Sequence, residues 1–219
     1  MTTKIATEEL ELLELEYGHR GPGEGGLVPG GDDGEPNAPA VPQHTYLTGI
    51  VLALAAILMF FLALTSSFIV RKGLSTDWVP FRMPPILWLN TGLLLLSSFT
   101  LEWARRALER ESLSGFRRWW GLTTGLGVAF LVGQILAWQQ LAAAGVFLAS
   151  NPSNSFFYLL TGLHGLHLLG GIIALLHVGF GSQSGGRLQR PTAVNVAGIY
   201  WHFMGVLWVY LFLLLLLGQ

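Results

Sequence analysis

The sequence contains no cysteine, and this absence excludes disulfides, thiolate nucleophiles, iron–sulfur clusters and thiolate metal sites. Charged residues are also scarce, at 11% of the 219 residues, whereas a soluble domain carries about 25%. Hydrophobic residues make up 52% of the chain. Because a water-exposed surface would be hard to build from this composition, we expect a protein that crosses a membrane several times.

Charge separates the chain into two parts. Residues 1–43 contain nine acidic and two basic residues, whereas residues 44–219 contain four acidic and ten basic residues. Glycine, proline and acidic residues alternate through residues 18–42, where too little apolar surface is available to offset the entropy of ordering. We therefore expect residues 1–43 to form a disordered tail and residues 44–219 to form the membrane domain. The acidic residues 7–17 fit either a frayed helix or a docking motif for a partner subunit.

Five apolar segments follow the tail, and each is long enough to cross a hydrocarbon core of about 30 Å at about 1.5 Å per residue. They cover approximately residues 46–70, 85–104, 119–143, 156–180 and 194–217. Tryptophan favours the membrane interface, and five tryptophans lie near the predicted ends: Trp78, Trp88, Trp103, Trp119 and Trp120. The predicted fold class is an all-α membrane protein, a bundle of five transmembrane helices with a disordered N-terminal tail.

The basic residues of the short loops predict the orientation, because cytoplasmic loops carry an excess of Lys and Arg. Loops on the side of the N-terminus carry seven such residues, and loops on the opposite side carry three. We therefore expect the N-terminus in the cytoplasm and the C-terminus outside.

Ionisable residues within membrane segments indicate function by default, since burying a charge there costs at least about 2.5–3.5 kcal/mol. Glu102 is the one acidic residue inside the predicted spans, and Arg105 and Arg106 follow it at i+3 and i+4. This spacing predicts an ion pair near the end of the helix. The scarcity of carboxylates disfavours an ion-driven transporter, an internal proton relay and a carboxylate-bridged metal site.

Histidines are the remaining candidates for chemistry within the membrane. Four lie in the last two predicted spans: His164, His167, His177 and His202. The first two share a helical face at i, i+3 and could ligate haem or a metal. Their poor match in depth to His202 favours hydrogen bonds to helices, lipid headgroups or a partner instead. A face of small residues beside them favours close helix packing, and its members are Gly162, Gly165, Gly170 and Gly171.

Polar side chains inside the other spans are expected to link helices within the bundle. They are Ser97, Ser98, Thr100, Thr123, Thr124, Gln134 and Thr161. The sequence has no phosphate-binding loop, no HExxH motif and no basic nucleic-acid patch, so no nucleic-acid partner is expected.

The last four apolar segments carry more specific motifs. Residues 155–171 read SFFYLLTGLHGLHLLGG, and residues 200–212 read YWHFMGVLWVYLF. These segments resemble the FF-x-LTG-x-HG-x-H-x-x-x-G and YWHFVD-x-VW-x-x-LF helices of the haem-copper oxidase (cytochrome c oxidase) subunit III family. NTGLLLLSSFTLEWA and GLTTGLGVAFLVGQILAW resemble the two helices before them. The resemblance covers roughly residues 85–217 in the family's order, and five helices resemble its shorter bacterial form.

The resemblance implies a non-catalytic subunit of a haem-copper terminal oxidase, acting in aerobic respiration in a bacterial cytoplasmic membrane. It implies no cofactor in this chain; haem and copper are expected in partner subunits, which would reduce oxygen and pump protons. The expected partners are subunit I, against which this chain would pack through its Gly and Ser faces, subunit II and phospholipid. The positions expected to contact lipid or another subunit are His164, His167, Trp201, His202, Arg71 and Arg106.

Three positions lack acids that the resemblance would place there. Ala56 stands where the family commonly has Glu, Ala137 where Glu is usual, and Gly205 where Asp is usual. Each change removes a titratable group, which favours a scaffold role over tuning of proton uptake.

Two alternatives remain open at the level of sequence. One is an accessory protein of a nitric oxide reductase system, because such a protein also resembles subunit III. The other is a self-sufficient membrane protein that binds haem through the histidines of the last two spans.

Overall fold

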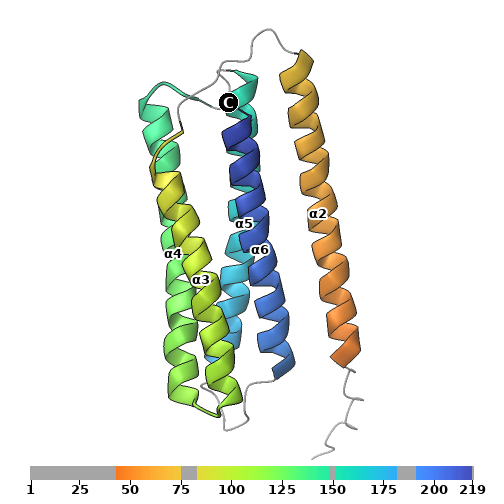
Figure 1. Cartoon of the computed structure of the whole chain (residues 1–219), viewed down its shortest axis with the longest axis vertical. Coiled ribbons are helices and arrows are strands. Elements are labelled where there is room, and N and C mark those ends of the chain that lie inside the picture. Colours follow the sequence, from red (N-terminus) through yellow and green to blue (C-terminus); the bar gives the residue numbers. More distant parts are fainter. Residues whose placement is uncertain (1–42, 75–82, 148–150, 182–190, 219) are drawn as a thin grey trace, which may run out of the picture. The chain divides into compact units, whose positions relative to one another are not determined.

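A computed structural model describes residues 43–74, 83–147, 151–181 and 191–218. Within these ranges the chain forms five α-helices, each long and apolar enough to cross a membrane. They are α2 (Gln43–Leu74), α3 (Ile86–Glu109), α4 (Leu113–Ala143), α5 (Pro152–Gly181) and α6 (Pro191–Leu217) (Figure 1). The predicted five-helix fold is therefore confirmed. The predicted tail, its acidic segment 7–17 and Trp78 lie outside the described residues.

Each helix extends beyond its predicted apolar segment at one end or at both. The largest difference is in α4, which begins at Leu113 rather than at residue 119. Hydropathy identifies the part of a helix that crosses the hydrocarbon core, whereas backbone hydrogen bonding continues the helix into the interface. Ser112 precedes α4 and accepts a hydrogen bond from the Gly115 amide at 3.4 Å, which caps the helix. The turn between α3 and α4 is short, and Glu111 adopts a left-handed conformation there with φ of 56°.

Four of the helices form a closed ring of neighbours. Contacts join α3 to α4, α4 to α5, α5 to α6 and α6 back to α3. Buried apolar side chains fill this ring, among them Leu94, Leu101, Phe130, Leu168 and Trp208. In a membrane such packing gains dispersion energy and interhelical hydrogen bonds rather than a hydrophobic driving force.

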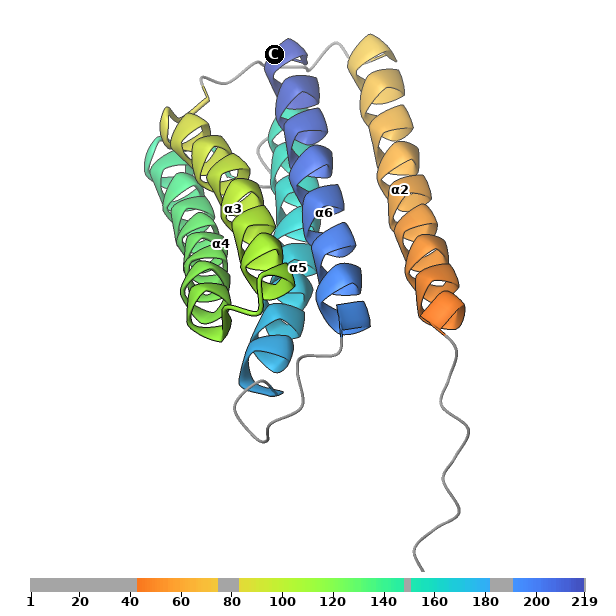
Figure 2. The ribbon, with the colours of Figure 1, turned by 60° about the horizontal axis from the view of Figure 1, so that its bottom comes forward.

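Helix α2 packs on the outside of this ring, against α5 and α6 (Figures 1 and 2). The Phe61 ring lies edge-on to His167 at 5.6 Å, and the Phe68 ring lies edge-on to Phe156 at 5.6 Å. At its C-terminal end, Lys72 Nζ donates to the Leu217 carbonyl at 3.4 Å. The rest of α2 is mostly exposed, so much of its apolar surface is available to lipid or to another subunit.

Successive helices run in opposite directions, which places their ends in two groups (Figure 1). The C-terminal ends of α2, α4 and α6 share one end of the bundle, here named the Arg71 end. The C-terminal ends of α3 and α5 share the other, here named the Arg106 end. The α3–α4 turn lies at the Arg106 end.

Candidate functional site

The six sequence-predicted contact residues do not converge on one site. His164 and Trp201 are buried inside the bundle, whereas His167 and His202 are partly exposed. Arg71 and Arg106 are exposed, but they belong to opposite ends of the bundle. The two arginines therefore lie at opposite ends of the bundle, and His164 and Trp201 lie in its interior.

The interior is instead organised by indole N–H groups that bond hydroxyls on neighbouring helices. In each case the donor and the acceptor belong to different helices: Trp201 to Ser97 at 2.9 Å, Trp208 to Thr91 at 3.0 Å, and Trp138 to Thr161 at 3.1 Å. These bonds join α6 to α3 twice and α4 to α5 once. Each bond provides a partner for one donor and one acceptor. This stabilises the bundle because no water is present in the membrane interior to bond these groups instead.

The predicted polar links are confirmed at several positions and differ at others. Ser97 and Thr161 accept the indole bonds, and Thr100 pairs with Thr123 across 2.8 Å to join α3 to α4. Thr124 instead donates to the Trp120 carbonyl of its own helix at 3.0 Å. The hydroxyls of Ser97, Thr100, Thr123 and Thr161 were thus predicted from sequence, whereas Thr91 was missed. The tryptophan donors were not predicted, because their depth relative to the facing helix depends on the packing.

Trp120 is covered by a neighbouring helix rather than exposed on the surface of the bundle. The side chain is buried, and its indole N–H donates to the Leu175 carbonyl of α5 at 2.9 Å. Since α4 begins earlier than predicted, Trp120 lies two turns inside the helix rather than at its start. Trp88 and Trp103 are exposed, and their place at a membrane interface stays a prediction.

His164 has an apolar, aromatic environment. The residue is 0% exposed, and its ring lies 5.0 Å from Trp208 and 5.9 Å from Phe130. Both ring nitrogens lack a hydrogen-bond partner among the described residues, as do the side-chain amides of Asn90 and Gln134. The expectation of a hydrogen-bonding His164, and of an amide link through Gln134, therefore differs from the structure.

His167 faces a different neighbour from His164. Its Nδ1 lies 2.7 Å from the Leu163 carbonyl of the same helix, and its ring contacts Phe61 of α2. The i, i+3 spacing places the two rings on neighbouring parts of the α5 surface. The His164 ring contacts α4 and α6, whereas the His167 ring contacts α2. The described residues include no group of three or more His, Asp or Glu side chains that could hold a metal ion.

The glycines of α5 serve two faces rather than the single face predicted. A Cβ on Gly162 would lie 3.7 Å from the Trp138 ring of α4, whereas one on Gly171 would lie 2.9 Å from the Tyr200 ring of α6. Both faces hold large side chains of this same chain, and Ser97 is fully buried. Gly171 and Ser97 are consequently covered by other helices of the bundle, whereas Gly170 is exposed.

The three positions that lack an expected acid have different surroundings. Ala56 is exposed on α2, so a side chain there would point away from the rest of this chain. Ala137 is 0% exposed, and Gly205 is buried, so that a Cβ added to Gly205 would lie 3.4 Å from Ser98 Oγ. A carboxylate at position 56 would therefore face lipid or another subunit, whereas one at position 137 or 205 would need a partner inside this bundle.

The predicted ion pair at the Arg106 end is confirmed. Glu102 accepts from Arg105 at 3.4 Å and from Arg106 at 3.3 Å. The three side chains are between 34% and 59% exposed, so solvent or headgroups screen the pair and it contributes little to stability.

Comparison with known proteins agrees with this helical arrangement. Residues 38–218 match the family model for cytochrome c oxidase subunit III. Cytochrome c oxidase subunit 3 of Synechocystis sp. is 33% identical over 175 residues, which cover 77% of this chain and 74% of that protein. The corresponding protein of Thermostichus vulcanus is 33% identical over 172 residues, covering 76% of this chain and 84% of the relative. A probable cytochrome c oxidase subunit 3 of Nocardia farcinica is 34% identical over 169 residues, covering 75% and 83%.

The match includes every helix that the structure describes. It therefore extends the resemblance seen in the last four spans to α2, which carries no distinctive motif of its own. Five apolar helices and this relationship together identify a multi-pass membrane protein. The chain belongs to the cytochrome c oxidase subunit III family.

Proposed function

We propose that this chain is a non-catalytic subunit III of a haem-copper terminal oxidase in a bacterial cytoplasmic membrane. Subunits I and II would be its partners, and subunit I would hold the haem and copper that reduce oxygen. This chain would support the complex by packing and by binding phospholipid. The single observation that carries the proposal is the family match, which spans all five described helices.

The interior of the bundle supports a structural role. The indole bonds of Trp201 and Trp208 hold α6 against α3. Haem binding through His164 and His167 would require both rings to face the same site. The His164 ring instead contacts rings of α4 and α6, whereas the His167 ring contacts α2. This geometry favours a scaffold over a haem protein.

The exposed residues support contacts with lipid or another subunit. Arg71 at one end and Arg106 at the other are placed for headgroups, and His167 and His202 are partly exposed on α5 and α6. His164 and Trp201 would act indirectly, by fixing the helices that present those surfaces. The exposed apolar side chains of α2 offer a further surface for subunit I.

The orientation is part of the proposal. The described residues of the Arg106 end include Arg105, Arg106, Arg110, Arg117 and Arg118, whereas those of the Arg71 end include Arg71 and Lys72. Because cytoplasmic surfaces carry the excess of Lys and Arg, the Arg106 end would face the cytoplasm. The N-terminus would then be cytoplasmic and the C-terminus outside.

Purification of the tagged chain in mild detergent, followed by mass spectrometry of its partners, tests the proposal. We expect a haem-copper subunit I and subunit II in stoichiometric yield. Recovery of nitric oxide reductase subunits in their place would contradict the oxidase assignment and support the alternative accessory role. Recovery of no respiratory subunit would contradict both.

A further inference from the structure

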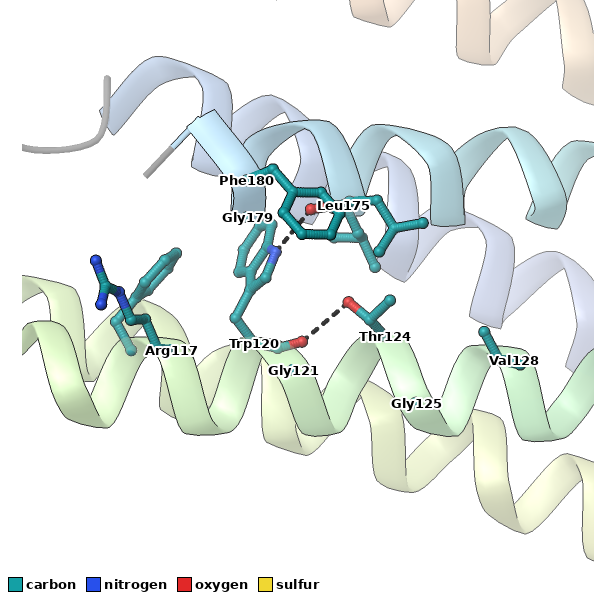
Figure 3. A pocket seen from close by; sticks show the side chains of 11 residues that line it. Arg117, Trp120, Gly121, Thr124, Gly125, Val128, Leu175, Gly179 and Phe180 are labelled. Carbon is teal, nitrogen blue, oxygen red and sulfur yellow. Dashed lines mark hydrogen bonds between the residues drawn. The ribbon is translucent and has the colours of Figure 1, made fainter. Parts of the chain in front are cut away.

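A groove of about 440 Å³ lies between α4 and α5 at the Arg106 end (Figure 3). Its volume is within the range of about 300–1,000 Å³ that is typical of ligand sites. Its floor is formed by buried side chains, including Trp120 and Leu175, and its walls include the exposed Val128 and Phe180. The lining is almost entirely apolar, so an apolar occupant fits it.

Two glycines of α4 open this groove. A Cβ built on Gly121 or on Gly125 meets no atom of the chain within 4 Å, so the missing side chains leave unfilled space. Both residues line the groove and are exposed. The space is thus open to an occupant from outside the chain rather than used for packing within it.

The polar groups of the floor are already satisfied. The Trp120 indole donates to the Leu175 carbonyl at 2.9 Å, and the Thr124 hydroxyl donates to the Trp120 carbonyl at 3.0 Å (Figure 3). An occupant therefore needs to supply no hydrogen bond along the groove. A hydrocarbon chain meets this condition, since it has none to offer.

Arg117 supplies a cation at one end of the groove. It lies at the opposite end from Val128 in Figure 3, and the two residues are separated by about 16 Å along α4 at 1.5 Å per residue. Half of a hydrocarbon core of about 30 Å is about 15 Å, so the groove has the length of one leaflet. The described residues of this bundle end carry five arginines and three glutamates, which leaves an excess of positive charge.

We propose that this groove binds an anionic phospholipid of the leaflet at the Arg106 end. Arg117 would contact the phosphate, and one acyl chain would lie over Gly121 and Gly125 toward Val128. The inference rests on the lipid binding of the proposed function and names its site. A transmembrane helix of a partner could also pack over Gly121 and Gly125. It would not account for the cation of Arg117 at the end of an apolar groove that has the length of one leaflet.

Photo-crosslinking of the intact complex tests this site. The probes are phosphatidylglycerol and phosphatidylcholine that carry the same diazirine-labelled acyl chain, and the cross-linked peptides are mapped by mass spectrometry. We expect phosphatidylglycerol to label residues 117–128 and 175–180 about fivefold more than phosphatidylcholine, as one basic side chain near the headgroup predicts.

Two pairs of variants separate the headgroup from the acyl chain. Arg117→Gln should remove the preference for phosphatidylglycerol, whereas Arg118→Gln, at the neighbouring position that does not line the groove, should keep it. Gly125→Leu should reduce labelling by both lipids, because its side chain fills the groove. Gly92→Leu is the matched control, since Gly92 is exposed on α3 and also has no atom within 4 Å of a Cβ.

Equal labelling by the two lipids, or labelling unchanged by Gly125→Leu, would overturn the proposal. Cross-links from these segments to a partner polypeptide instead of lipid would also overturn it and assign the groove to a subunit interface. If Gly125→Leu fails to accumulate, the Arg117 and Arg118 pair still decides the headgroup claim. Recovery of subunit I in the same preparation reports separately on the proposed function, so the two failures are distinguishable.

Discussion

The indole N–H of Trp201 on α6 donates to Ser97 Oγ on α3 across 2.9 Å, and both residues are buried. The same indole ring covers Gly127 of α4 and Gly171 of α5. One side chain therefore contacts all three of the other helices in the ring. Trp201 is better understood as the centre of the bundle than as a surface contact of the subunit.

Ser97→Ala removes the acceptor and leaves the Trp201 indole without its bond. We expect a loss of about 0.6 kcal/mol of stability, the average for interhelical hydrogen bonds in membranes, and at most about 1.7 kcal/mol. Unfolding of the purified chain in detergent, followed by tryptophan fluorescence, measures the change. Ser98→Ala is the matched control at the next position, and an equal effect of both substitutions would contradict the role given to the Trp201 bond.

Gly127→Ala tests the fit of the Trp201 ring. A Cβ at position 127 would lie 2.5 Å from Cη2 of this buried ring, so either the ring or a helix must shift. We expect a destabilisation of about 1–3 kcal/mol from overpacking. Gly92→Ala, at an open position on α3, should instead be neutral or stabilising by about 0.5–1 kcal/mol. Similar unfolding midpoints for the two variants would show that α4 and α6 do not pack as described.

His164→Leu tests whether this residue is a ligand or part of the packing. Because neither ring nitrogen has a partner among the described residues, an apolar replacement of similar size should leave stability unchanged or raise it. The haem absorbance of the complex should also stay the same. Loss of a haem band in His164→Leu would support the haem-binding alternative.

Ala56→Glu tests the consequence of the missing carboxylate. Position 56 is exposed on α2, so the substitution does not disturb the interior of this chain. If the family's carboxylate supports proton uptake, Ala56→Glu should lengthen the time for which the oxidase turns over before it inactivates. Ala56→Gln has the same shape without the charge and should behave like the unchanged chain. Equal lifetimes for the two variants would show that a carboxylate at this position has no part in proton uptake.

Much of the fold could be predicted from the sequence because membrane segments follow simple rules. Apolar length identified all five helices, and the spacing of Glu102 with Arg105 and Arg106 predicted the ion pair. Helix ends were less accurate, because α4 continues through the interface to Leu113 where hydropathy has already fallen. The interhelical bonds of Ser97, Thr100, Thr123 and Thr161 were also predicted, since a hydroxyl in a membrane interior needs a partner, but the bond of Thr91 was not.

Neighbour relationships could not be predicted in the same way. The i, i+3 spacing predicted one shared face for His164 and His167. In the structure the two side chains contact different helices, because His164 packs against α6 and His167 packs against α2. The glycines of α5 likewise serve α4 and α6 rather than one partner. Such details depend on the rotation of each helix about its axis, which packing rather than periodicity determines. The groove beside Arg117 depends on the same rotation.

Removal of this chain from the purified complex would test its non-catalytic role without any substitution. The reduced-minus-oxidised spectrum and the initial rate of oxygen consumption are measured before and after removal, on both fractions. We expect the haem bands and the initial oxygen-reducing activity to stay with the remaining subunits and the isolated chain to show no haem band. Haem bands that follow this chain would contradict a non-catalytic role and make the histidines of α5 and α6 the site of the chemistry.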